Sequence, residues 1–332
     1  MPDLTGTLPV IDYARHPDYQ LEPDPGLGRR GMELLEPLIE RAREVETRRQ
    51  ATFGYRYGFR DSLGKQLVRD GSVQMQIPDS AMDAISAGAA PLLDTVAGRI
   101  GAIRASGRQP SFGERMQAAD PVASAPLWLA VEGSLRDLGV HDLLRAYYAA
   151  PGSKIRNMAA IISSPEDAEV RFGAGEDGPS PTVGLHVDSS GTCILKLVLY
   201  LRDVDEGGGP FGMVPGSHLW GQGGEERIRR RAFDKSPLVS RGHKSRRTFV
   251  SLPKELQVKA EFGGDLLPGS EEAADLVARE RVTVGGRGRF TLFDPEAIHR
   301  GGMALRSERR ALLITLGARY LREDFTPGLP KH

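Results

Sequence analysis

The sequence predicts a mainly β core with flanking helices, and three observations lead to this fold class. Helical periodicity of apolar residues is confined to the first part of the chain, up to about residue 150. Short apolar segments typical of strands follow, and no internal repeat at a solenoid period is visible. Helices first and short strands afterwards are typical of an antiparallel sheet with helices packed outside it. A chain of 332 residues can form such a core as a single domain.

The N-terminal part is predicted to be helical after an extended start. The first thirty residues are rich in Pro and Gly and indicate an arm laid across the body. From Met32 onwards, apolar residues recur at helical spacing with Glu and Arg between them. A second helix is expected over 81–104, where Ser80 can cap the start. A third is expected over 126–148, with a break near Gly139.

The C-terminal part has the pattern of short strands separated by turns. Four strands are expected, over 155–162, 194–201, 289–294 and 311–317. A polar loop rich in Gly and Pro separates the first two. The segment 219–288 is charged and irregular. A short helix is expected within it over 271–281, where Ser270 can cap the start. A segment of this length with little regular structure inside a compact domain is usually functional or disordered.

Composition excludes several classes of protein. With 44 basic and 44 acidic residues the formal net charge is zero, which argues against binding to nucleic acid or to acidic membranes as the main activity. The 39% of hydrophobic residues argues against a disordered chain. One cysteine, Cys193, fits a reducing compartment. Because neither a signal peptide nor an apolar run of about 20 residues is evident, we expect a cytoplasmic protein.

The pair His186 and Asp188 carries the chemistry that the sequence suggests. In a strand, residues two apart point to the same side, so this pair can present an imidazole and a carboxylate to one metal ion. His299, which follows the strand expected over 289–294, is the candidate third ligand. Two histidines and one carboxylate on one face leave three coordination positions open, as in non-haem Fe(II) oxygenases. His218, in a Pro-Gly-Ser-His turn, is the competing third ligand, and His299 is preferred.

The stretch HVDSSGTCILKLVLYLRDVDEGGGPFGMVPGSHLWG resembles the metal-binding stretch of the phytanoyl-CoA dioxygenase-like (PhyH) family of Fe(II)/2-oxoglutarate-dependent dioxygenases. The shared features are the His-x-Asp pair, a strand that runs into an acidic and Gly-rich turn, and the sequence Val214-Pro215-Gly216-Ser217-His218. The resemblance covers roughly residues 151–318. It implies a double-stranded β-helix, a cupin-like jelly roll. Within a single domain 1–332, residues 1–150 would form the arm and helical support, 151–318 the catalytic core, 219–288 a lid or insertion, and 319–332 a tail.

The resemblance also implies an activity and its cosubstrates. His186, Asp188 and His299 would hold Fe(II), with no further catalytic residue, and 2-oxoglutarate and O2 would be consumed. The enzyme would oxidise an unactivated C–H bond of a small-molecule metabolite and release succinate and CO2. Because related halogenases replace the carboxylate with a small residue, Asp188 favours hydroxylation or another oxidation such as desaturation. Neither the substrate nor the oligomeric state follows from the sequence.

Two basic residues are candidates for contacts with the cosubstrate. In that family a basic residue about eleven positions after the distal histidine holds the far carboxylate of 2-oxoglutarate, and here it is Arg310. Arg309 would then point to the opposite face. On the strand 194–201, Lys196 shares a face with Val198, opposite the leucines, and it is expected either to contact cosubstrate or substrate or to be a surface lysine. Some family members carry an aromatic residue near Val198, so the pocket wall differs there.

Two functions from other classes compete with the oxygenase. A cupin-like metal-binding protein without redox activity would need the three ligands but not the arginine. A scaffold protein that has lost activity would usually lack at least one ligand, and all three are present here.

Overall fold

The structure is a computed structural model of the 332-residue chain. It describes residues 22–53, 62–148, 152–165, 185–188, 194–218, 271–302 and 304–319, with scattered residues between 225 and 253. Most of the expected N-terminal arm, Cys193, the expected tail beyond residue 319 and most of the segment 219–270 lie outside the described residues.

The front of the chain is helical, as predicted, and its helices begin earlier than expected. The helices before the main sheet are α1 (Pro25–Phe53), α2 (Ser62–Asp70), α3 (Asp79–Ala105), α4 (Ala125–Asp137) and α5 (Val140–Tyr147), with a 3-10 turn at Gly113–Arg115. Pro78, and not Ser80, occupies the N-cap position of α3. The predicted break between α4 and α5 is confirmed at Gly139, whose φ of 71° lies in the left-handed region that favours glycine.

The larger of two antiparallel sheets has six strands in the order β1-β7-β4-β9-β3-β2. They are β1 (Ser72–Gln76), β2 (Met116–Ala118), β3 (Gly152–Ser163), β4 (Ile194–Tyr200), β7 (Arg289–Phe293) and β9 (Arg309–Arg319). The strands β3, β4, β7 and β9 are those that the sequence predicts. The two edge strands, β1 and β2, come from the first 150 residues and were not expected. This part of the chain therefore supplies strands to the sheet in addition to the helices that cover it.

The smaller sheet has three strands in the order β6-β5-β8: β5 (Phe211–Met213), β6 (Arg281–Thr283) and β8 (His299–Arg300). Helix α10 (Glu271–Arg279) precedes β6, close to its predicted bounds. Strand β6 is part of this sheet, although it lies within the segment 219–288 that was expected to be a lid or insertion. Tyr200 of β4 ties the two sheets together: its hydroxyl donates to the carbonyl of Thr283 (2.7 Å) and accepts from the amide of Phe211 (2.9 Å).

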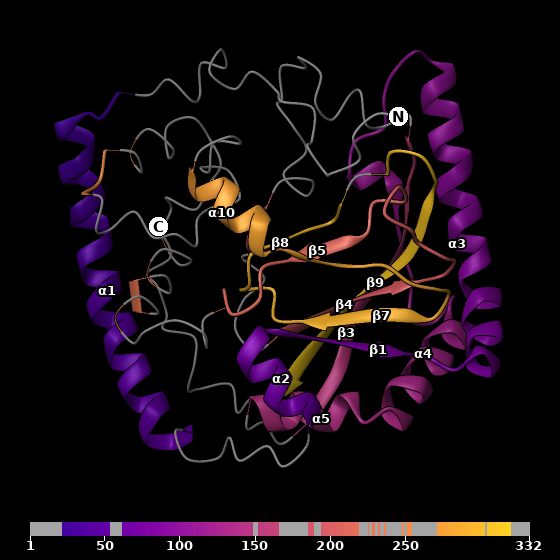
Figure 1. Ribbon diagram of the computed structural model, residues 1–332, viewed down its shortest axis with the longest axis horizontal. Coiled ribbons are helices and arrows are strands. Elements are labelled where there is room, and N and C mark those ends of the chain that lie inside the picture. Colours follow the sequence, from indigo (N-terminus) through magenta and orange to yellow (C-terminus); the bar gives the residue numbers. More distant parts are fainter. Residues whose placement is uncertain are drawn as a thin grey trace.

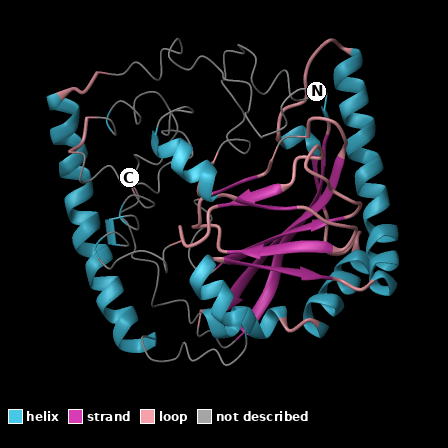
Figure 2. Ribbon diagram, viewed as in Figure 1, coloured by secondary structure: helices cyan, strands magenta, loops and turns pink. Residues whose placement is uncertain are grey.

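The two faces of the larger sheet contact different parts of the molecule (Figures 1 and 2). The leucines at 195, 197, 199 and 201 pack with buried residues of α3, α4 and α5 in the main apolar core. Val198 and Tyr200, on the other face, pack with Phe211 and Met213 of the smaller sheet. The leucine face of β4 therefore packs in the helix-covered core, as its pattern predicts. The opposite face, expected to meet water or a polar cavity, is apolar at Val198 and Tyr200 and lies between the sheets.

Helix α1 lies away from the sheets, on the far side of the molecule (Figure 1). Its apolar residues Leu38, Ile39 and Ala42 pack instead against Ile228 and Ala232 of the segment 219–288. An ion pair between Arg43 and Glu225 (3.2 Å) and a hydrogen bond from the amide of Asp24 to Ser251 Oγ (2.8 Å) add to this contact. The long helix and the described residues between 225 and 252 therefore form one packed unit.

Among the described helices, none combines the length and the apolar character that a membrane span requires.

Candidate metal centre

Backbone hydrogen bonds bring His186 and His299 side by side. The two residues form an isolated antiparallel bridge in which each amide donates to the other's carbonyl at 2.8 Å. His299 is also the first residue of β8, which pairs with β5 of the smaller sheet. The imidazole rings of the two histidines lie 4.4 Å apart, centroid to centroid, and each residue is 4% exposed. Residues 113 positions apart in the sequence thus share one site.

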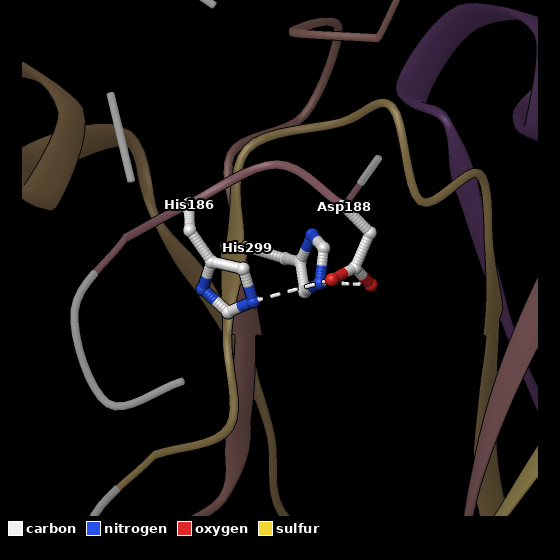
Figure 3. Close-up of side chains that lie close together, drawn as sticks. All are labelled: His186, Asp188 and His299. Carbon is white, nitrogen blue, oxygen red and sulfur yellow. Dashed lines mark ion pairs between the residues drawn. The ribbon is translucent and has the colours of Figure 1, made fainter. Parts of the chain in front are cut away.

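Asp188 completes the group, as Figure 3 shows. Its amide donates to the carbonyl of Pro295 (2.9 Å), which holds the segment 185–188 against the turn before His299. Its Oδ1 lies 3.6 Å from His186 Nε2 and its Oδ2 lies 3.2 Å from His299 Nε2. One ligand atom from each of the three residues lies within 4.8 Å of the others. The structure therefore brings together the three residues that the sequence singled out.

The chemistry of the donors fits a divalent metal. His299 Nδ1 lies 2.7 Å from the carbonyl oxygen of Ala297, and because a carbonyl only accepts, Nδ1 carries the proton. In the neutral ring the lone pair is then on Nε2, the atom that faces Asp188 and that would bind a metal ion. A histidine ligand held in this way by a second hydrogen bond is the usual arrangement in metal sites. Two imidazoles and one carboxylate suit Fe(II).

Asp188 is held in its ionised form. Burial by itself raises the pKa of a carboxyl group, but the hydrogen bond and charge of His299, with the charges of Lys196 and His186, hold the pKa of Asp188 well below its usual range. Lys196 of β4 donates from Nζ to Asp188 Oδ2 at 2.7 Å, and its side chain is 28% exposed. Lys196 therefore reaches the metal-binding group itself and is not a free surface lysine.

His218 does not join the three residues. Its ring is buried against Gly71, where an added Cβ would lie 2.8 Å from the imidazole, and its Nε2 lies 3.0 Å from the carbonyl of Val68. Its neighbour Ser217 accepts from the amide of Ile298 (2.8 Å). The Pro-Gly-Ser-His turn thus supports the segment before His299 without supplying a ligand to the group.

The arginines at the start of β9 have the opposite orientation to the expected one. Arg310 precedes Leu312 and Ile314 of the main apolar core, so it lies on the helix-covered face of the larger sheet. Its Nε donates to Glu308 (2.6 Å), and its side chain is 40% exposed. Arg309 shares a face with Ala311, in the layer between the sheets. The alternation of a strand therefore contradicts the inward position expected for Arg310.

Arg309 is a buried cation without an acidic partner among the described residues. It is 5% exposed, and Nη1 donates to the carbonyls of Gly209 and Gly301, the latter two residues after His299. Nη2 lies 3.2 Å from Ser163 Oγ, and Nε is buried without a hydrogen-bond partner in the described part of the chain. Burial lowers the pKa of Arg309, opposed by the nearby hydroxyl of Tyr200. A buried charge costs several kcal/mol unless it is compensated, and here two carbonyls and a hydroxyl compensate it in part.

Comparison with known proteins gives distant structural matches only. No protein-family model matches the chain, and no curated protein matches it either. Among solved structures, it is similar to AviO1 from Streptomyces viridochromogenes Tue57, with 16% identity over 80% of this chain and 96% of that chain and a TM-score of 0.41. It is also similar to EctD from S. alaskensis in its apoform, with 15% identity over 77% of this chain and 75% of that chain and a TM-score of 0.45.

A third match has a stated activity. SnoN, a non-heme alpha ketoglutarate dependent epimerase from nogalamycin biosynthesis, is 15% identical over 77% of this chain and 81% of that chain, with a TM-score of 0.41. SnoN has been solved with Fe3+ and alpha ketoglutarate, and EctD with Fe and with 2-oxoglutarate. At this level of similarity the family of the chain is not established, and the interpretation of the site depends on its own residues.

Proposed function

We propose that the chain is a non-haem Fe(II)- and 2-oxoglutarate-dependent oxygenase that acts on a small molecule. The observation that carries the proposal is the convergence of His186, Asp188 and His299, whose ligand atoms lie within 4.8 Å of one another in a largely buried position. His186, Asp188 and His299 would hold Fe(II) and leave coordination positions free for the other reactants. When bound, the metal and the keto acid supply the oxidising power that no amino-acid side chain has.

The side chains around the site would bind and orient the other reactants. Arg309, in place of Arg310, would hold the far carboxylate of 2-oxoglutarate, because its Nε is unpaired and its charge has no acidic partner among the described residues. Nε and Nη2 form the side-on edge of a guanidinium that takes a carboxylate through two parallel hydrogen bonds. Lys196 would contact the cosubstrate or an anionic group of the substrate, since its ammonium group already reaches Asp188.

The two packed sheets support a finer proposal for the fold. We infer a jelly roll of the kind found in the phytanoyl-CoA dioxygenase-like family, with the metal site between the larger and the smaller sheet. The bridge between His186 and His299 and the hydroxyl of Tyr200 both contribute to holding that layer together. The overall reaction would convert a substrate C–H bond, 2-oxoglutarate and O2 into C–OH, succinate and CO2. Asp188 favours hydroxylation over halogenation.

The buried guanidinium of Arg309, which has no acidic partner in the described part of the chain, favours this function over a cupin-like protein without redox activity, because such a protein has no need of a buried anion site. The test is consumption of 2-oxoglutarate by the Fe(II)-loaded protein in air, measured as succinate formed with and without candidate substrates. We expect slow succinate release in wild type that a true substrate accelerates, and none with Asp188→Ala. Metal binding without any succinate in wild type would favour the cupin-like alternative.

A further inference from the structure

The turn formed by residues 294–298 joins β7 to β8 and contacts two of the three candidate ligands. The carbonyl of Pro295 accepts the amide of Asp188 (2.9 Å), which fixes the backbone that carries the carboxylate. The carbonyl of Ala297 lies 2.7 Å from His299 Nδ1, which fixes the ring orientation and the tautomer. A shift of this turn would therefore move the carboxylate and one imidazole together.

Asp294 gives the turn its shape. Its Oδ1 accepts from the amide of Glu296 (2.9 Å), and its carbonyl accepts from the amide of Ala297 (2.9 Å). The first is the hydrogen bond of an Asx turn, in which a short side chain replaces a backbone acceptor. The second is the backbone hydrogen bond of a β-turn. The amide of Asp294 donates to the carbonyl of Gly71 (2.8 Å), so the start of the turn is also fixed to the segment between α2 and β1.

Tyr147 connects this turn to the helical layer. It is the last residue of α5, its side chain is fully buried, and its hydroxyl donates to Asp294 Oδ2 at 2.9 Å. Asp294 is itself 1% exposed. A buried carboxyl group needs such donors, because leaving it unsatisfied is costly. The two oxygens of Asp294 thus have separate tasks, since one shapes the turn and the other anchors it to α5.

We propose that Tyr147 and Asp294 are positioning residues for the metal centre, and this proposal depends on the proposed function. The hydroxyl of Tyr147 fixes the carboxyl group of Asp294, which fixes the turn. Through Pro295 and Ala297, the turn holds Asp188 and His299 at the separation that a metal ion requires. Neither Tyr147 nor Asp294 belongs to the group of candidate ligands. Their effect passes through two backbone carbonyls, so it should appear in metal affinity and ligand geometry.

The chain offers a matched control in the neighbouring tyrosine. Tyr148 is also buried, and its hydroxyl donates at 2.9 Å to the carbonyl of Ile194 at the start of β4. The two rings pack edge to face, with centroids 4.8 Å apart. Tyr147→Phe and Tyr148→Phe therefore each remove a hydroxyl and the hydrogen bond given above from the same region, and the hydrogen bond of Tyr147 is the one that ends on the turn next to the candidate ligands.

The experiment measures Co(II) binding to the full-length wild type and both variants, by the visible spectrum of the bound ion. We expect Tyr147→Phe to raise the dissociation constant about tenfold and to change the band shape, as loss of outer-shell partners does. Tyr148→Phe should stay within about twofold of wild type, with a similar loss of thermal stability. Equal effects of the two variants, or no effect of Tyr147→Phe, would overturn the proposal.

Hydrogen exchange separates this proposal from the proposed function. In the metal-free protein, Tyr147→Phe should speed exchange of the amides of Asp188 and Glu296, whereas Tyr148→Phe should not. If wild type binds no metal, the proposed function fails. The exchange measurement then tests, without any metal, whether Tyr147 anchors this turn. Faster exchange in Tyr147→Phe alone supports the anchoring, and unchanged exchange overturns it.

Discussion

Two neighbouring arginines on β9 differ in everything that decides whether they can bind an anion. Arg309 is buried between the sheets with no acidic partner among the described residues, whereas Arg310 is partly exposed and paired with Glu308. Sequence spacing pointed to Arg310, because nothing in the sequence fixes the residue at which the alternation of the strand begins. Ala311 and Leu312 are both apolar, so the pattern does not show which face of β9 is the inner one.

We predict that Arg309→Gln weakens 2-oxoglutarate binding about ten- to a hundredfold, the loss expected for a charge-assisted pair worth about 1.5–3 kcal/mol. Arg310→Gln is the matched control on the opposite face and should bind as wild type does. The measurement is calorimetric titration of 2-oxoglutarate into anaerobic protein loaded with Fe(II). If Arg310→Gln shows the loss and Arg309→Gln does not, the cosubstrate site lies on the other face of the sheet.

In the proposed site, Lys196 would compete with a metal ion for Asp188, because both would be cations at the same carboxylate. We predict that Lys196→Met binds Fe(II) more tightly, by up to about tenfold, because removing one positive charge near the ion removes a repulsion. Binding of 2-oxoglutarate or of an anionic substrate should weaken in the same variant. Lys154→Met, which changes an exposed lysine of β3, serves as control. Weaker metal binding by Lys196→Met would show instead that Lys196 supports the site.

The glycines of α4 and of the α4–α5 junction allow a test at the scale of helices. Gly139 has a φ of 71°, and an added Cβ there would meet no other atom within 4 Å, so alanine would suffer backbone strain alone. We predict that Gly139→Ala lowers the free energy of unfolding by about 1–2 kcal/mol. Gly133, inside α4, is equally free of contacts, and Gly133→Ala should raise stability by about 0.5–1 kcal/mol. Urea unfolding measures the free energy of unfolding of both variants. If the two substitutions change it in the same direction, Gly139 is not held in a left-handed conformation that disfavours alanine.

Helix α1 packs against described residues between 225 and 252. An added Cβ at Gly28 would lie 2.4 Å from the carbonyl oxygen of Ser251, so any larger residue must push these backbones apart. We predict that Gly28→Ala loosens this contact and speeds proteolytic cleavage between residues 225 and 252. Binding of Fe(II) and 2-oxoglutarate should not change. Unaltered proteolysis would show that α1 and this segment do not depend on each other.

The elements that the sequence predicted are those with strong local signals. The strand β4 and the helix α3 have long apolar patterns, and the break at Gly139 has a residue suited to a left-handed conformation. The strands β1 and β5 were not expected. Each is short, and each is defined by its pairing with β7 or with β6 and β8, because such strands gain their stability from partners far away in the sequence.

At the scale of the whole molecule, the sequence predicted the antiparallel core with helices outside it and the residues that meet at the metal centre. His186 and Asp188 form a His-x-Asp pair and His299 follows a recognisable strand, and the resemblance of the surrounding stretch to a known family singled these residues out. Tyr147, Asp294 and Arg309 could not be found in this way. Their environment depends on how α5, the 294–298 turn and β9 meet in space, and each is an ordinary residue type in its own segment.

Anaerobic addition of Fe(II) and 2-oxoglutarate tests the central claim most directly. If the three ligands hold Fe(II) with a bidentate keto acid, wild type should develop a weak visible charge-transfer band that requires both components. His299→Ala should give no band under the same conditions. A folded wild-type protein that gives no band at saturating Fe(II) and 2-oxoglutarate would contradict the claim that His186, Asp188 and His299 form an oxygenase centre.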